Sequence, residues 1–223
     1  MIRSTFYKEW LKIRYYVLGA LVFNILFFIY LFFDIREPFQ NGPAIMAWYS
    51  AIHIHTIFYE KIKYLLPATG ILIGIAQFIP EITKSRLRMS LHLPVNPNLL
   101  ILSYVCIGIA AVIVIGIIDI ILFYIIVIKF FPKEVSSSAL MTGLPWFYSG
   151  LVAYLATTQV ILETKSGRRI FYAVIFCRFI GLFFMSNEYS SYAHVTERLF
   201  LISLLFIPAI FFPLYRFRNG GIE

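Results

Sequence analysis

The chain has 223 residues, of which 61% carry hydrophobic side chains and 13% are charged, and its mean hydropathy is +0.84. A soluble domain of this length would be roughly half apolar and about a quarter charged. The composition therefore excludes a soluble globular protein and predicts one all-α integral membrane domain over residues 1–223. The net charge of +8 comes from basic residues that flank apolar runs, which indicates membrane topology and contact with anionic lipids, with no nucleic-acid partner.

The N-terminal segment, residues 1–14, combines an apolar face with a basic one. The residues that define the two faces are Phe6, Tyr7, Trp10, Lys8 and Lys12. This pattern predicts a helix that lies in the headgroup plane, with its lysines toward anionic lipid. The apolar run 15–33 follows, and it lacks a small-residue cleavage site. We therefore interpret it as a retained first membrane span and not as a signal peptide.

Asn24 is the only polar interruption of this first span, which we expect to end at Asp34. The next apolar run, 44–59, is preceded by the turn residues Asn41-Gly42-Pro43. If this run crossed the membrane, the basic residues at 84–88 would face the outside, against the positive-inside rule. We therefore predict an interfacial or extended helix on the outer surface for residues 44–59.

Metal or hydrolase chemistry has little support in the sequence. His53 and His55 are two positions apart and would point to different sides of a helix, and no cysteine or paired carboxylate accompanies them. His92 and His194 do not join them in a pattern such as H-E-x-x-H. We expect no metal site and no catalytic site, which argues against an intramembrane enzyme.

The second predicted span, about 62–80, contains Gly70 and Gly74 in a GxxxG pair, and Gln77 near its cytoplasmic end. Glycines at this spacing allow helices to pack closely in a membrane. The sequence leaves open whether that packing is within one chain or between two chains.

The segment PEITKSRLRMSLHLPVNP, from Pro80 to Pro97, separates two apolar runs and is itself charged. Helical spacing places Leu87 and Leu91 on one side and Lys84 and Arg88 on another. This predicts a short amphipathic helix on the side of the membrane where positive charge collects. The alternative is a solvated loop that carries stop-transfer charges.

The third apolar run, 98–131, would extend about 50 Å as a helix, against a hydrocarbon core of about 30 Å. It therefore either tilts and projects from the bilayer or breaks near Gly116. Asp119 lies in this run and must be paired, protonated or facing water.

Pro132, Lys133 and the serines at 136–138 are expected to form a short external loop. The remaining spans are predicted at 145–162, 170–186 and 198–215. Gln159 lies in the fourth span and Arg178 in the fifth, where they either line a pathway or make interhelical hydrogen bonds. An Asp119–Arg178 salt bridge is a further possibility, although their depths along their helices argue against it.

The distribution of basic residues sets the orientation. They concentrate at the N-terminus, at 84–88, at 165–169 and at 216–218. The positive-inside rule then predicts six spans with both termini in the cytoplasm of a multi-pass cell-membrane protein, in a bacterial inner membrane or a plasma membrane.

These features together resemble the transmembrane permease subunit of ABC transporters of the type-2 exporter class. The resemblance rests on the basic N-terminal helix FYKEWLKIR, the six spans, and Glu81, Arg86-Leu87-Arg88 and Leu93-Pro94 after the second span. Lys84-Ser85 stands where the family usually has glycine. In that family the first helix is the elbow helix and residues 81–96 are the coupling helix, which contacts the ATPase subunit.

The resemblance implies the partners and the contact residues. Those expected to touch the ATPase are Glu81, Lys84, Arg86, Leu87, Arg88, Met89, Leu91 and Pro94. Two ATPase subunits would bind ATP and Mg²⁺, because this chain has no G-x-x-x-x-G-K-[ST] sequence and so is not itself an enzyme. A second permease, the same chain or a paralogue, would complete the pathway. The alternative interpretation is a non-transporting membrane scaffold or accessory subunit.

Overall fold

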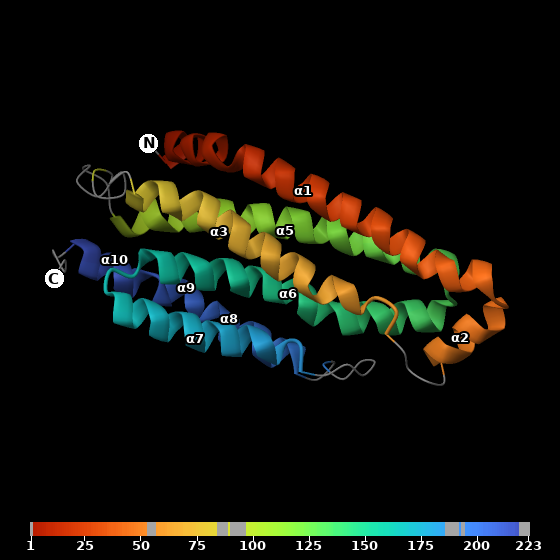
Figure 1. The fold of residues 1–223 in the computed structure, drawn as a ribbon. Helices are drawn as coiled ribbons and strands as arrows, with labels where there is room; N and C mark the ends of the chain where they lie inside the picture. Colours follow the sequence, from red (N-terminus) through yellow and green to blue (C-terminus); the bar gives the residue numbers. More distant parts are fainter. Residues whose placement is uncertain are drawn as a thin grey trace.

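The computed structural model describes residues 2–52, 57–83, 89, 97–185, 192 and 195–218. Throughout this part of the chain the secondary structure is helical, and the helices lie side by side in an elongated bundle (Figure 1). Four helical segments are long and apolar enough to cross a membrane. The predicted all-helical class is confirmed, and these four helices indicate a membrane-embedded protein.

The four long segments lie at Ser4–Asn41, Glu60–Thr83, Pro97–Phe130 and Val135–Leu162. The helices of the described residues are α1 (Ile2–Asn41), α2 (Ala44–Ile52), the 3-10 helix η1 (Glu60–Tyr64), α3 (Leu65–Thr83), α5 (Pro97–Phe130), α6 (Lys133–Leu162), α7 (Ser166–Leu182), α8 (Thr196–Leu204), α9 (Phe206–Ala209) and α10 (Phe211–Arg218). Because α2 has nine residues, it is about 14 Å long and too short to cross a bilayer.

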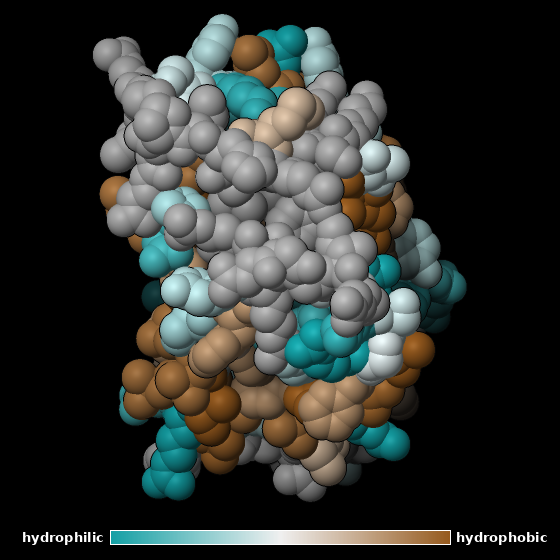
Figure 2. All heavy atoms as spheres, turned by 90° about the vertical axis from the view of Figure 1, so that its left-hand side faces the viewer, coloured by the Kyte–Doolittle hydropathy of each residue, from teal (hydrophilic) through white to brown (hydrophobic). Residues whose placement is uncertain are grey.

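The start of α1 and the end of α10 lie at the same end of the bundle, where α3 also ends and α5 begins (Figure 1). We call this the terminal end, and the opposite end, which carries α2 and the α5–α6 junction, the distal end. Figure 2 looks onto the terminal end, where hydrophilic residues of the described part lie among hydrophobic ones. The first turn of α7 adds Arg168 and Arg169 to this end.

The first helix is longer than predicted. Residues 2–14 continue into the span without a break, and the helix passes the expected end at Asp34 to reach Asn41. Pro38 lies in its last turn, where a missing N–H removes only one backbone hydrogen bond. Phe39 packs against Phe130, with ring centroids 5.4 Å apart, and this contact holds the final turn against α5.

The predicted external loop at 132–138 is wrong. After Phe131 and Pro132, α6 begins at Lys133 and includes the three serines. The Ser136 hydroxyl donates a 3.0 Å hydrogen bond to the carbonyl oxygen of Pro132, so the serine satisfies itself within the helix. The third apolar run is one continuous helix, α5, which resolves the alternative of a break near Gly116.

Helices α3 and α6 approach each other closely at the predicted GxxxG pair. A Cβ atom on Gly70 would lie 2.1 Å from the carbonyl oxygen of Gly150, and one on Gly74 would lie 3.1 Å from the Thr157 side chain. The packing that the glycines allow is therefore within one chain, which answers the question that the sequence left open.

Replacement of Gly70 by alanine should lower the stability of the bundle, because the new methyl group would meet backbone and not a flexible side chain. Overpacking of this kind costs about 1–3 kcal/mol. Gly19→Ala is the matched control, since its Cβ would have no neighbour within 4 Å. Thermal unfolding in detergent should give a lower Tm for Gly70→Ala alone; equal Tm values would contradict the close contact.

Candidate functional site

A buried glutamine joins three helices near the terminal end. Gln77 of α3 is fully buried. Its Nε2 donates a 2.8 Å hydrogen bond to the carbonyl oxygen of Tyr104 on α5, and its Oε1 accepts one of 2.8 Å from the Tyr154 hydroxyl on α6. A Cβ atom on Gly108 would lie 2.0 Å from the Tyr154 hydroxyl, so this glycine leaves the room that the tyrosine occupies.

An ion cluster connects α1 to the last turn of α3. Lys12 Nζ lies 2.7 Å from Glu9 Oε2 and 2.9 Å from Glu81 Oε1. Both glutamates are fully buried, and the Lys12 side chain is 14% exposed. Gln77 Nε2 also donates a long hydrogen bond of 3.4 Å to Glu9 Oε2. Because buried charges require partners, these contacts fix α1 against the helix from which residues 84–96 continue.

A second polar contact lies midway along the bundle. Asn24 of α1 donates a 2.7 Å hydrogen bond to Asp119 Oδ2 of α5, and it accepts one of 3.2 Å from the Thr69 hydroxyl of α3. All three residues are buried. Asp119 is thus paired within the bundle, which removes the cost of leaving a polar group unpartnered in hydrocarbon.

The structure describes two of the eight predicted ATPase contacts, Glu81 and Met89, and they differ in exposure. Glu81 does not lie on the surface: it is fully buried and ion-paired with Lys12. Met89 is 63% exposed. The other six residues, Lys84, Arg86, Leu87, Arg88, Leu91 and Pro94, lie outside the described residues.

The predicted elbow residues also differ in exposure. Phe6, Tyr7, Lys8 and Trp10 are exposed on α1. Lys12 was expected to face lipid headgroups, and this expectation is wrong. The lysine points toward two buried carboxylates because each would otherwise be an unpaired charge.

Gln159 and Arg178, two further polar residues of the spans, take no part in the polar contacts described above. Gln159 of α6 is buried, and its Oε1 has no hydrogen-bond partner among the described residues. Arg178 of α7 is exposed, while Asp119 is paired with Asn24. The Asp119–Arg178 salt bridge does not form.

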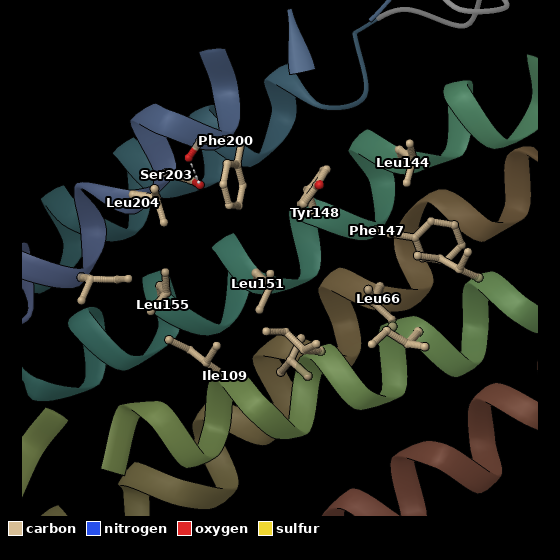
Figure 3. Close-up of a pocket in the computed structure, with 16 residues that line it drawn as sticks. Leu66, Ile109, Leu144, Phe147, Tyr148, Leu151, Leu155, Phe200, Ser203 and Leu204 are labelled. Carbon is tan, nitrogen blue, oxygen red and sulfur yellow. Dashed lines mark hydrogen bonds between the residues drawn. The ribbon is translucent and has the colours of Figure 1, made fainter. Parts of the chain in front are cut away.

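An apolar cavity of about 380 Å³ lies among α3, α5, α6, α8 and α9. Figure 3 shows Leu151 and Leu155 of α6 facing Phe200 and Leu204 of α8 across it. The hydroxyl of Ser203, also in its wall, donates to the carbonyl oxygen of Phe200 at 2.6 Å and is therefore satisfied within its own helix. Such a lining can hold an aliphatic or aromatic group and offers little for a charged one. The described residues contain no group of three metal-ligating side chains.

Sequence reasoning missed three members of these polar contacts: Glu9, Thr69 and Tyr154. The spacing of Glu9 and Lys12, three positions apart on a helix, is the pattern of an ion pair and was the one available indication. Tyr154 is one of 15 tyrosines in the chain, and its neighbours in the sequence do not distinguish it.

Lys12→Met should destabilise the protein strongly, because it leaves Glu9 and Glu81 buried without their cation. Removal of one partner of a buried ion pair costs about 3–5 kcal/mol. Lys8→Met makes the same change on the exposed face of α1 and should stay within about 0.5 kcal/mol. Detergent-phase melting of the two variants measures the difference, and matching melting curves would show that the cluster contributes nothing.

We compared the chain with protein-family models, curated proteins and solved structures, and none of the three comparisons gave a match. The function is therefore argued from the residues and from their geometry.

Proposed function

We propose that this chain is the membrane permease subunit of an ATP-driven exporter of the ABC type. It forms the translocation pathway as a dimer, and residues 81–96 couple it to separate ATPase subunits, which bind ATP and Mg²⁺. In this proposal α7 and the broken helix α8–α10 supply the fifth and sixth crossings of a cell membrane. The terminal end of the bundle is cytoplasmic.

The distribution of charge supports this orientation. The terminal end carries Lys8, Arg14, Lys165, Arg168 and Arg169 beside the ion-paired Lys12, and among these five Arg168 pairs with the carboxylate of Glu163. At the distal end two lysines are neutralised: Lys61 lies 2.7 Å from Asp34, and Lys63 pairs with Glu60. An excess of basic residues on one side is the usual mark of the cytoplasmic side.

The proposal rests on the buried polar contacts that fix the last two turns of α3, from which the coupling segment continues. The segment continues from α3, whose last turn is ion-paired with α1 through Glu81 and Lys12. One turn earlier, Gln77 is hydrogen-bonded to α5 and α6. A displacement of residues 84–96 would therefore reach four helices through buried polar contacts. A segment that receives force from a neighbouring subunit requires such a connection to the membrane helices.

The mechanism follows from this connection. Closure of the two ATPases on ATP pushes residues 81–96, with Arg86 and Arg88 orienting the segment and Leu87, Met89 and Leu91 supplying its apolar contact. Because α1, α3, α5 and α6 are joined at the terminal end, they move together as one body. The permease then alternates between inward-facing and outward-facing arrangements.

The double variant Leu87→Asp/Leu91→Asp should abolish association with the ATPase while membrane insertion is kept, because two charges replace the apolar contact. Ile45→Asp/Met46→Asp is the matched control at the distal end, where both residues are more than 70% exposed in α2. Affinity purification from native membranes, followed by detection of a Walker-motif subunit and of ATP turnover, gives the result. Retained co-purification with full turnover in the first variant would leave a scaffold as the better interpretation.

The proposed orientation predicts opposite labelling of the two ends. In a Cys106→Ser/Cys177→Ser background, Arg88→Cys should react with a membrane-impermeant thiol reagent only after the cells are opened. Met46→Cys should react in intact cells. Labelling of Arg88→Cys from outside would exclude contact with a cytoplasmic ATPase.

A further inference from the structure

The ion cluster between α1 and α3 has two carboxyl groups for one ammonium group. Lys12 Nζ lies 2.7 Å from Glu9 Oε2 and 2.9 Å from Glu81 Oε1, and both glutamates are fully buried. Within the described residues, no second cation contacts either of them. If all three groups were ionised, the cluster would contain one uncompensated negative charge away from water, which is strongly unfavourable.

The groups packed around the cluster do not supply the missing positive charge. Gln77 of α3 donates to Glu9 Oε2 at 3.4 Å and accepts from the Tyr154 hydroxyl of α6. From α5, the ring of Tyr104 lies 5.6 Å from Lys12 Nζ. An amide carries no charge, and phenols are neutral at neutral pH. The charge balance therefore depends on the two carboxyl groups themselves.

Each carboxyl group has one oxygen that is free to carry a proton. Glu9 Oε2 and Glu81 Oε1 face Lys12, whereas Glu9 Oε1 and Glu81 Oε2 are buried and have no hydrogen-bond partner in the described part of the chain. Burial raises the pKa of the Glu9 carboxyl above its ordinary value, although Lys12 opposes this effect. One proton on either free oxygen leaves one carboxylate, one ammonium group and no net charge.

The position of the cluster lets protons reach it from water. A hydrocarbon core of about 30 Å takes about 20 helical residues. Counted back along α1 from Asp34, where the apolar run ends, the core reaches the vicinity of Arg14. Glu9 is therefore outside the core, and the neighbouring Lys12 side chain is 14% exposed.

We propose that Glu9 and Glu81 hold one proton between them, which makes this cluster a proton-binding site at the joint between α1 and α3. While the proton is bound, Lys12 balances the one remaining carboxylate. Loss of the proton leaves two carboxylates at one ammonium group, and their repulsion weakens the contact of α1 with the last turn of α3. The proposal rests on these contacts and holds whether or not the chain transports a substrate.

Infrared spectroscopy of protein labelled with ¹³C at the glutamate side-chain carboxyl tests for the proton directly. A protonated carboxyl group has a C=O stretching band that is separate from the bands of a carboxylate. The label shifts this band for glutamates and leaves the bands of Asp34 and Asp119 in place. The unaltered protein in lipid vesicles should show a label-sensitive band at neutral pH, and a higher pH should remove it.

Three variants locate the proton. Glu9→Gln should abolish the band, and Glu81→Gln should also abolish it, because Lys12 balances a single carboxylate without a proton. Glu37→Gln makes the same change at an exposed position of α1 and should keep the band.

The pH dependence of stability is a second measurement on the same proteins. Because the folded protein binds one proton more than the unfolded chain above the ordinary pKa of glutamate, its stability should fall as the pH rises. The unfolding equilibrium constant should increase up to about ten-fold per pH unit until the folded protein also loses the proton. Glu9→Gln should show a smaller fall than Glu37→Gln. Asp119 is present in both variants and cancels in the comparison.

Three results would overturn the proposal. Absence of a label-sensitive band in the unaltered protein at neutral pH would show that both carboxyl groups are charged, with a second cation supplied from outside the described residues. A band that persists in Glu9→Gln would place the proton on another glutamate. A band that persists in Glu81→Gln would show that burial alone protonates Glu9, without the second carboxyl group.

Discussion

The close contact of α3 with α6 is the constraint on which the other buried contacts depend. Gly70 approaches the backbone of Gly150 so closely that no side chain fits between them. Four residues along α6, this approach brings the Tyr154 hydroxyl under Gln77, at the point where Gly108 of α5 also lacks a side chain. The glycines thus set the distances between these helices, and the polar side chains form hydrogen bonds across the resulting contacts.

The polar contacts follow a common rule in a protein surrounded by lipid. Several buried charged or amide side chains have a partner on another helix: Lys12 pairs with Glu81, and Asn24 bonds to Asp119. In hydrocarbon, water cannot replace a missing partner. The same contacts that solvate these groups therefore fix which helices are neighbours. The apolar cavity beside α8 has no such bonds across it, and only side-chain packing defines its shape.

Much of the fold could be predicted from the sequence, and the errors have physical causes. The apolar runs gave the helical class, and Gly70 and Gly74 gave the site of close packing, but the partner helix is a long-range choice that local spacing does not encode. Pro132, Lys133 and the serines at 136–138 predict a loop, yet the Ser136 hydroxyl bonds within α6. The resemblance places Glu81 at the ATPase contact, but Glu81 is buried by an ion pair with Lys12, which lies 69 residues away in the sequence and is not visible to local spacing.

The order of these contacts along the chain has a consequence for biogenesis. The bonds that join α1, α3, α5 and α6 use residues from Glu9 to Tyr154. None of them needs α7 or the helices that follow. Membrane proteins emerge from the ribosome N-terminus first, so the first 162 residues, up to the end of α6, contain every partner required to satisfy these groups. A nascent chain halted after α6 would already hold these residues in pairs, and the last helices would join a scaffold whose interhelical polar contacts are formed.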